Sequence, residues 1–184
     1  MPDEAFLKSR RRPAGFTLLE LAVVLFIMGL ILTVAMPYLG GLRSAQLKSE
    51  ARRLASRANY LYEEAGAQKV LLRLTFDLDN NGYFVTRLDP FALRPAFLPE
   101  RGPAGVSVRM PAGVRLRDAW VEGSGTFQRG AVSSQFYPSG SADATVVHLS
   151  DEKRTLTLSI DPFNGRVAIM NGDLSVESLI GSRP

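Results

Sequence analysis

The feature that most constrains this chain is an apolar segment, residues 16–37, in which Glu20 is the one charged residue. As a helix, this segment would span roughly 33 Å at about 1.5 Å per residue, enough for a hydrocarbon core of about 30 Å. Three arginines at positions 10–12 precede it and favour a cytoplasmic position for that end. We therefore predict one membrane-spanning helix, with the rest of the chain outside the cytoplasm.

Glu20 is unusual in such a segment, because a carboxylate inside a membrane is costly and such residues are functional candidates. The carboxylate needs a cation. Cleavage of the chain after Gly15 would give Phe16 a free α-amine that supplies one. In a packed filament, Glu20 of one subunit would meet the amine of its neighbour, and this contact would set the axial register.

Residues 15–20, GFTLLE, resemble the prepilin motif of type IV pilins and type II secretion pseudopilins. The resemblance implies that a prepilin peptidase cleaves between Gly15 and Phe16 on the cytoplasmic face and methylates the Phe16 amine. It also implies that Glu20 is the assembly glutamate and that Pro37 is the proline that kinks or locally melts the family's N-terminal helix. The expected partners are therefore this peptidase, the inner membrane and other filament subunits.

Two other interpretations of the N-terminus are open. A secretory signal peptide has a basic start and an apolar region of about 7–15 residues, and residues 33–35 (TVA) would be its weak cleavage site. The second interpretation is a membrane anchor that no peptidase cleaves. Neither explains Glu20 together with the junction of Gly15 and Phe16, so the prepilin interpretation is favoured.

The chain divides into a leader (1–15), a transmembrane or filament-core helix (16–39), an amphipathic second half of that helix (40–66) and a periplasmic β-rich domain (67–184).

The formal net charge of the chain is +4, and loss of the leader, with four basic and two acidic residues, leaves +2. A chain so close to neutral gives no electrostatic reason to expect binding to nucleic acid. The sequence has no cysteine, so the domain relies on its core or on partners, and the missing disulfide loop favours a pseudopilin or minor pilin over a major pilin.

Apolar residues recur at steps of three and four between residues 42 and 65, which is the period of a helix. They are Leu47, Ala51, Leu54, Ala58, Leu61 and Ala65. Basic residues lie largely off this stripe, so the helix should pack its apolar face on a sheet. The cluster of Arg52, Arg53 and Arg57 is either a solvated face or a contact with acidic neighbours in a filament. Gly40 and Gly41 should loosen the backbone after Pro37.

From residue 70 the period changes to two, as in strands. The predicted strands are 70–76, 83–88, 114–121, 134–137, 145–149, 155–160 and 166–170. The resulting fold class is α+β and pilin-like: a long N-terminal helix, membrane-spanning in its first half and amphipathic in its second, packs on an antiparallel β-sheet domain.

Residues 89–113 are rich in proline and should form an irregular loop. Phe91, Phe97 and Leu98 in this loop either fold back on the domain or form a partner-binding surface.

The C-terminal half resembles the GspH/FimT branch of these families, through residues 136–140 (FYPSG) and 164–167 (NGRV). The resemblance implies a GspH-like minor pseudopilin, a structural subunit of the periplasmic pseudopilus of a type II secretion system, with other pseudopilins as partners in a filament tip. One alternative is a FimT- or FimU-like minor type IV pilin that binds DNA during DNA uptake. Its candidate residues are Lys153, Arg154, Arg166 and Arg183, but acidic residues lie among them. Another is a minor pilin of a motility or adhesion filament.

The sequence has no pattern typical of catalysis, a cofactor or a metal site. His148 is the single histidine and cannot form a zinc site without cysteines, so we interpret it as structural. Residues 77–82 match the first half of a calcium-binding EF-hand loop, but Val85 and Leu88 occupy later ligand positions. We therefore interpret this stretch as a hairpin turn, with Asn81 and Gly82 as its signal. We expect no enzyme, no cofactor and no metal.

Overall fold

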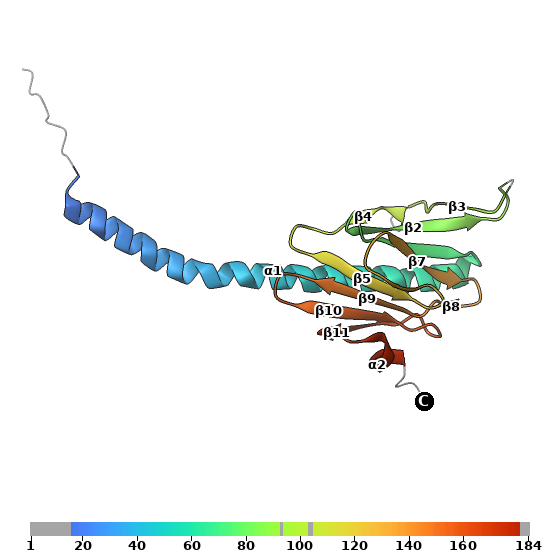
Figure 1. Ribbon diagram of the computed structural model, residues 1–184. Coiled ribbons are helices and arrows are strands. Elements are labelled where there is room, and N and C mark those ends of the chain that lie inside the picture. The colour runs from blue at the N-terminus through green and yellow to red at the C-terminus, as the bar shows by residue number, and fades with distance from the viewer. Residues whose placement is uncertain (1–15, 93, 103–104, 181–184) are drawn as a thin grey trace, which may run out of the picture. The chain divides into compact units, whose positions relative to one another are not determined.

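The computed structural model describes residues 16–92, 94–102 and 105–180, without the side chains of 34–44 and 180 (Figure 1). Two compact units meet in the sequence between Gly40 and Gly41. Helix α1, Leu18–Gln68, is helical on both sides of this boundary. The two glycines therefore do not end the helix, and the kink at Pro37 stays a prediction. Within the described part of the chain, no helical stretch combines the length and apolar character that a membrane span requires.

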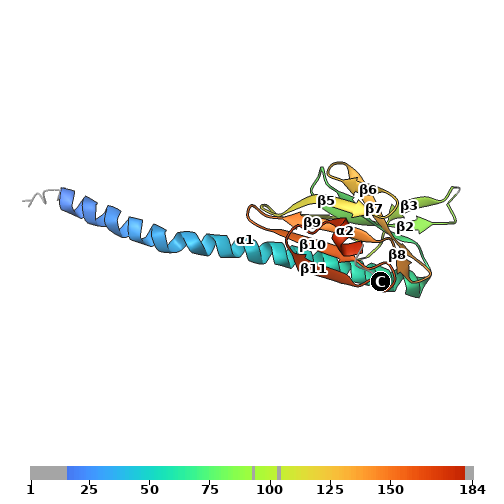
Figure 2. The same cartoon turned by 60° about the horizontal axis from the view of Figure 1, so that its bottom comes forward.

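The second unit contains two antiparallel sheets (Figures 1 and 2). The first has the strand order β3-β2-β1-β7-β8, with β4 also paired to β2. Its strands are β1 (Leu72–Asp77), β2 (Gly82–Asp89), β3 (Ala96–Pro99), β4 (Val108–Arg109), β7 (Ala131–Tyr137) and β8 (Ser141–Ala142).

The second sheet has the strand order β11-β10-β9-β5-β6. Its strands are β5 (Arg115–Val121), β6 (Gly125–Phe127), β9 (Thr145–Ser150), β10 (Thr155–Ile160) and β11 (Val167–Asn171), and a short helix α2 (Val176–Ile180) follows them. The predicted α+β class with antiparallel strands is confirmed. The structure adds that the strands divide between two sheets, since β7 pairs with β1 whereas β5 pairs with β9.

The proline-rich segment 89–113 is less irregular than expected. It provides β3 and β4, and both pair with β2 at the border of the first sheet. Pro99 ends β3 opposite Thr86, a place on an edge strand where the missing N–H of proline is tolerated. Within the segment, Phe97 folds back, with the Arg73 guanidinium 3.3 Å from its ring centre, whereas Phe91 is 94% exposed.

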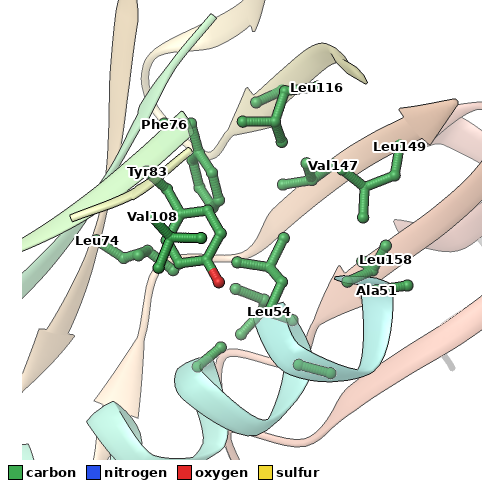
Figure 3. Close-up of a cluster of buried hydrophobic side chains, with 14 of the residues drawn as sticks. Ala51, Leu54, Leu74, Phe76, Tyr83, Val108, Leu116, Val147, Leu149 and Leu158 are labelled. Atoms are coloured by element: carbon green, nitrogen blue, oxygen red, sulfur yellow. The ribbon is translucent and has the colours of Figure 1, made fainter. Parts of the chain in front are cut away.

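The apolar stripe of α1 lies between the two sheets. All six stripe residues are at most 2% exposed. Figure 3 shows Leu54 with side chains of both sheets around it: Leu74, Phe76, Tyr83 and Val108 from the first, and Leu116, Val147, Leu149 and Leu158 from the second. The helix therefore joins the two sheets into one hydrophobic core, because each sheet turns an apolar face toward it.

The hairpin of β1 and β2 has the predicted turn. The carboxylate of Asp77 accepts hydrogen bonds from the backbone N–H and side-chain amide of Asn80, at 3.0 and 2.8 Å. Asn81 has a φ of 51°, and its side chain donates to the Val114 carbonyl and accepts the Leu116 N–H, both at 2.8 Å. These residues therefore shape the turn and fasten it to β5 in the second sheet.

Candidate functional site

The first turn of α1 carries the residues that the sequence singled out. The Glu20 backbone N–H donates to the Thr17 hydroxyl at 3.1 Å, and the Leu21 N–H donates to the Thr17 carbonyl at 3.1 Å. Thr17 is therefore the N-cap of the helix, since its side chain satisfies an N–H that has no partner within the helix. Glu20 follows at the position where a carboxylate also favours the positive end of the helix dipole.

This geometry gives Glu20 a local role that sequence reasoning missed. The spacing of Thr17 and Glu20 matches a capping box, a signal that was visible in the sequence. Phe16 is 82% exposed and immediately precedes the cap, so its backbone lies within one turn of Glu20. Gly15 lies outside the described residues, as does the side chain of Pro37, so their predicted roles stay predictions.

The large apolar side chains at the start of the same helix are exposed to solvent. From residue 18 to residue 32, every large apolar side chain is between 43% and 88% exposed. Soluble monomers rarely expose a continuous apolar surface of this size, and such a surface marks contact with a membrane or with other proteins. Residues 18–32 of α1 therefore present an apolar surface of the kind that such contacts use.

Residues 136–140 and 164–167, which resemble the GspH/FimT branch, form two turns that meet around Tyr62 of α1. Its hydroxyl lies 2.6 Å from the Gly140 carbonyl oxygen and 2.7 Å from that of Phe163, and donates to this pair. A Cβ atom on Gly165, which has a φ of 64°, would lie 2.1 Å from the Tyr62 ring. Packing against Tyr62 therefore requires glycine at position 165, whereas Gly140, with open space around it, suits its turn through a φ of 81°. The two turns together fix α1 to both sheets through Tyr62.

The residues proposed for DNA binding are not gathered at one place. Lys153 and Arg154 precede β10, and Arg166 follows the turn at its other end. A strand of this length separates its ends by roughly 17–20 Å. Arg183 lies outside the described residues. The described candidates therefore do not form the clustered basic face that a DNA site needs.

The N-terminal segment matches a known protein family. The family model of the prokaryotic N-terminal methylation motif matches residues 10–36, which include the Gly15–Phe16 junction and Glu20. The predicted methylation motif is thereby confirmed. No curated protein matches the chain.

Two solved structures of the minor pseudopilin EpsH, from the type 2 secretion system of Vibrio cholerae, are similar in fold. Their TM-scores are 0.56 and 0.57, at 14% sequence identity. Each match covers 71% of this chain, and 99% and 97% of the respective EpsH chain. The chain therefore has a pilin-like fold of the EpsH type, as predicted.

Proposed function

We propose that this chain is a structural subunit of a pilus-like filament, a GspH-like minor pseudopilin of a type II secretion pseudopilus. The observation that carries the proposal is the joint presence, in one chain, of an N-terminal methylation motif and an EpsH-like fold. Either feature alone is less specific, because many filament subunits share the motif and the fold alone implies no function. The role is structural and not enzymatic.

The proposed path starts in the inner membrane. A prepilin peptidase cleaves between Gly15 and Phe16 and methylates the new amine, and residues 16–39 anchor the chain as a single pass. The domain after the anchor lies in the periplasm. Assembly then moves the exposed apolar surface of α1 from lipid into contact with the helices of other pseudopilins, where it stays out of water.

Glu20 has two tasks in this proposal. Its position in the first turn favours the start of its own helix. In the filament its carboxylate pairs with the Phe16 amine of a neighbouring subunit. Removal of one member of a buried ion pair costs about 3–5 kcal/mol, whereas a lost helix cap costs about 1 kcal/mol. The two tasks therefore differ enough in magnitude to be separated by experiment.

The test compares Glu20→Ala with Thr17→Ala in the full-length chain. Both variants should be cleaved normally, because both changes lie beyond the processed bond. Glu20→Ala should fail to co-purify with sheared filaments or with other pseudopilins, and Thr17→Ala, which removes only the cap, should still assemble. If both variants assemble like the wild type, the ion pair has no role in assembly. If both fail equally, helix capping explains the effect and the ion pair does not.

A further inference from the structure

The chain after β11 returns over the second sheet, as residues 172–180. The Gly172 N–H donates to the Thr155 carbonyl at 2.8 Å, and the Thr157 hydroxyl donates to the Gly172 carbonyl at 2.7 Å. The Leu174 N–H in turn donates to the Thr157 hydroxyl at 3.1 Å. In Figures 1 and 2, α2 of this segment lies close to β10 and β11. We call residues 172–180 the C-terminal segment.

The C-terminal segment covers a row of polar residues on three neighbouring strands. Asp118 of β5 lies opposite His148 of β9, and His148 lies opposite Thr157 of β10. On β9 and β10 the core residues Leu149 and Leu158 alternate with this row, so the row occupies the other face of the sheet. All three polar residues are at most 7% exposed.

Both ring nitrogens of His148 face groups that can only accept hydrogen bonds. Nδ1 lies 2.5 Å from Oδ1 of Asp118, and Nε2 lies 3.0 Å from the Leu174 carbonyl oxygen and 3.3 Å from Oδ1 of Asp173. A neutral imidazole carries one N–H and would turn a lone pair toward an acceptor at its other nitrogen. An imidazolium donates from both nitrogens and satisfies both sides.

The charges around His148 fit a cation at this place. Among the described residues, Arg117 of β5 is a second basic group in this network. It bridges the two carboxylates, with Nε 2.8 Å from Asp118 and a terminal nitrogen 2.7 Å from Asp173. Two cations thus alternate with two anions, and Leu174 adds a carbonyl dipole. Thr157, the remaining neighbour in the row, has no charge. Asp173 belongs to the C-terminal segment, so the network joins this segment to β5 and β9.

The pKa directions agree with this geometry. The hydrogen bond to Asp118 raises the pKa of His148 above its ordinary value of 6.5, although burial opposes the shift. Burial acts to raise the pKa of Asp118, but the hydrogen bonds and charges of His148 and Arg117 outweigh it and hold that pKa below 3.8. The hydrogen bond from Arg117 lowers the pKa of Asp173.

We infer that protonated His148 holds the C-terminal segment on the second sheet, and that loss of this proton releases the segment and uncovers the polar row of Asp118, His148 and Thr157. The segment is then a pH-responsive cover, and its release creates a hydrogen-bonding surface that is otherwise closed. Because the raised pKa belongs to the folded state, the contribution of His148 is complete below about pH 6.5 and disappears as the pH rises through the folded value. The two carboxylates contribute above about pH 3.8 and lose their contribution below their lowered pKa values.

The test uses the full-length chain in detergent micelles. His148 is the single histidine, so ¹⁵N-histidine labelling gives the resonances of one ring. Near pH 6 both ring nitrogens should be protonated, and the titration midpoint should lie above 6.5. Hydrogen exchange of residues 172–180, corrected for the intrinsic pH dependence, should accelerate about tenfold or more across that titration, the scale of one charge-assisted hydrogen bond.

Variants separate this role from a merely structural one. His148→Gln should lose the pH-dependent step in exchange, whereas Glu177→Gln, a matched change at an exposed carboxylate of α2, should keep it. Asp173→Asn changes a half-exposed side chain that the core does not require, and it should move the His148 midpoint down toward 6.5. A midpoint at or below 6.5, one persistent neutral tautomer near pH 6, or exchange that is unchanged across the titration would overturn the inference.

Discussion

Leu54→Ala tests how α1 joins the two sheets. Leu54 is 2% exposed, and the side chains around it come from both sheets (Figure 3). Strands that are held in hydrogen-bonded ladders on both sides cannot easily move inward, so most of the cavity should persist. Leucine-to-alanine changes in buried sites cost about 2–5 kcal/mol, with the larger values where the surroundings do not relax. We therefore expect a loss of about 4 kcal/mol.

For a folded unit of this size, a loss of about 4 kcal/mol lowers the melting temperature by about 10 °C. The assay is thermal unfolding of the full-length chain in micelles, followed by circular dichroism of the sheets and by the fluorescence of Trp120, the single tryptophan, in β5. Leu98→Ala in edge strand β3 is the matched control, because Leu98 is 48% exposed, and it should lower the melting temperature by only about 3 °C. Equal effects of the two changes would refute the position of α1 between the sheets.

Two further changes test the cluster around Tyr62. Tyr62→Phe keeps the ring but removes the hydroxyl that donates to two turns, so it should cost about 1 kcal/mol, whereas Tyr60→Phe on an exposed position of the same helix should cost nothing measurable in the same unfolding assay. Gly165→Ala should cost about 3 kcal/mol, because its Cβ would meet the Tyr62 ring and its φ is positive. Gly130→Ala, at a φ of 75° with open space around it, isolates the backbone contribution and should cost about 1 kcal/mol. Equal losses at both glycines would show that contact with Tyr62 does not matter.

Local patterns in the sequence predicted much of this fold. The helix period fixed which residues of α1 face the core, and all six are buried. The period of two located β1, β2, β5, β7, β9, β10 and β11 to within a few residues. The remaining strands β3, β4, β6 and β8 are two to four residues long, too short to carry a period.

The division into two sheets could not be predicted, because alternation indicates which face of a strand is apolar and not which strand lies beside it. The same limit applies to the sites. Gly140 and Gly165 were visible as turn residues, but their common partner Tyr62 is far away in the sequence. The network of His148 likewise depends on the pairing of β5 with β9. By contrast, the Thr17 cap is local, and the spacing of Thr17 and Glu20 could have indicated it.

The measurement that tests the central proposal most directly is mass spectrometry of the N-terminus of the chain extracted from membranes, with and without an active prepilin peptidase. We predict that the mature chain begins at Phe16 with a methylated amine, and only when the peptidase is active, because the methylation motif spans this junction. A chain that keeps Met1 in the presence of the peptidase, or one that begins after Ala35, would contradict the proposal.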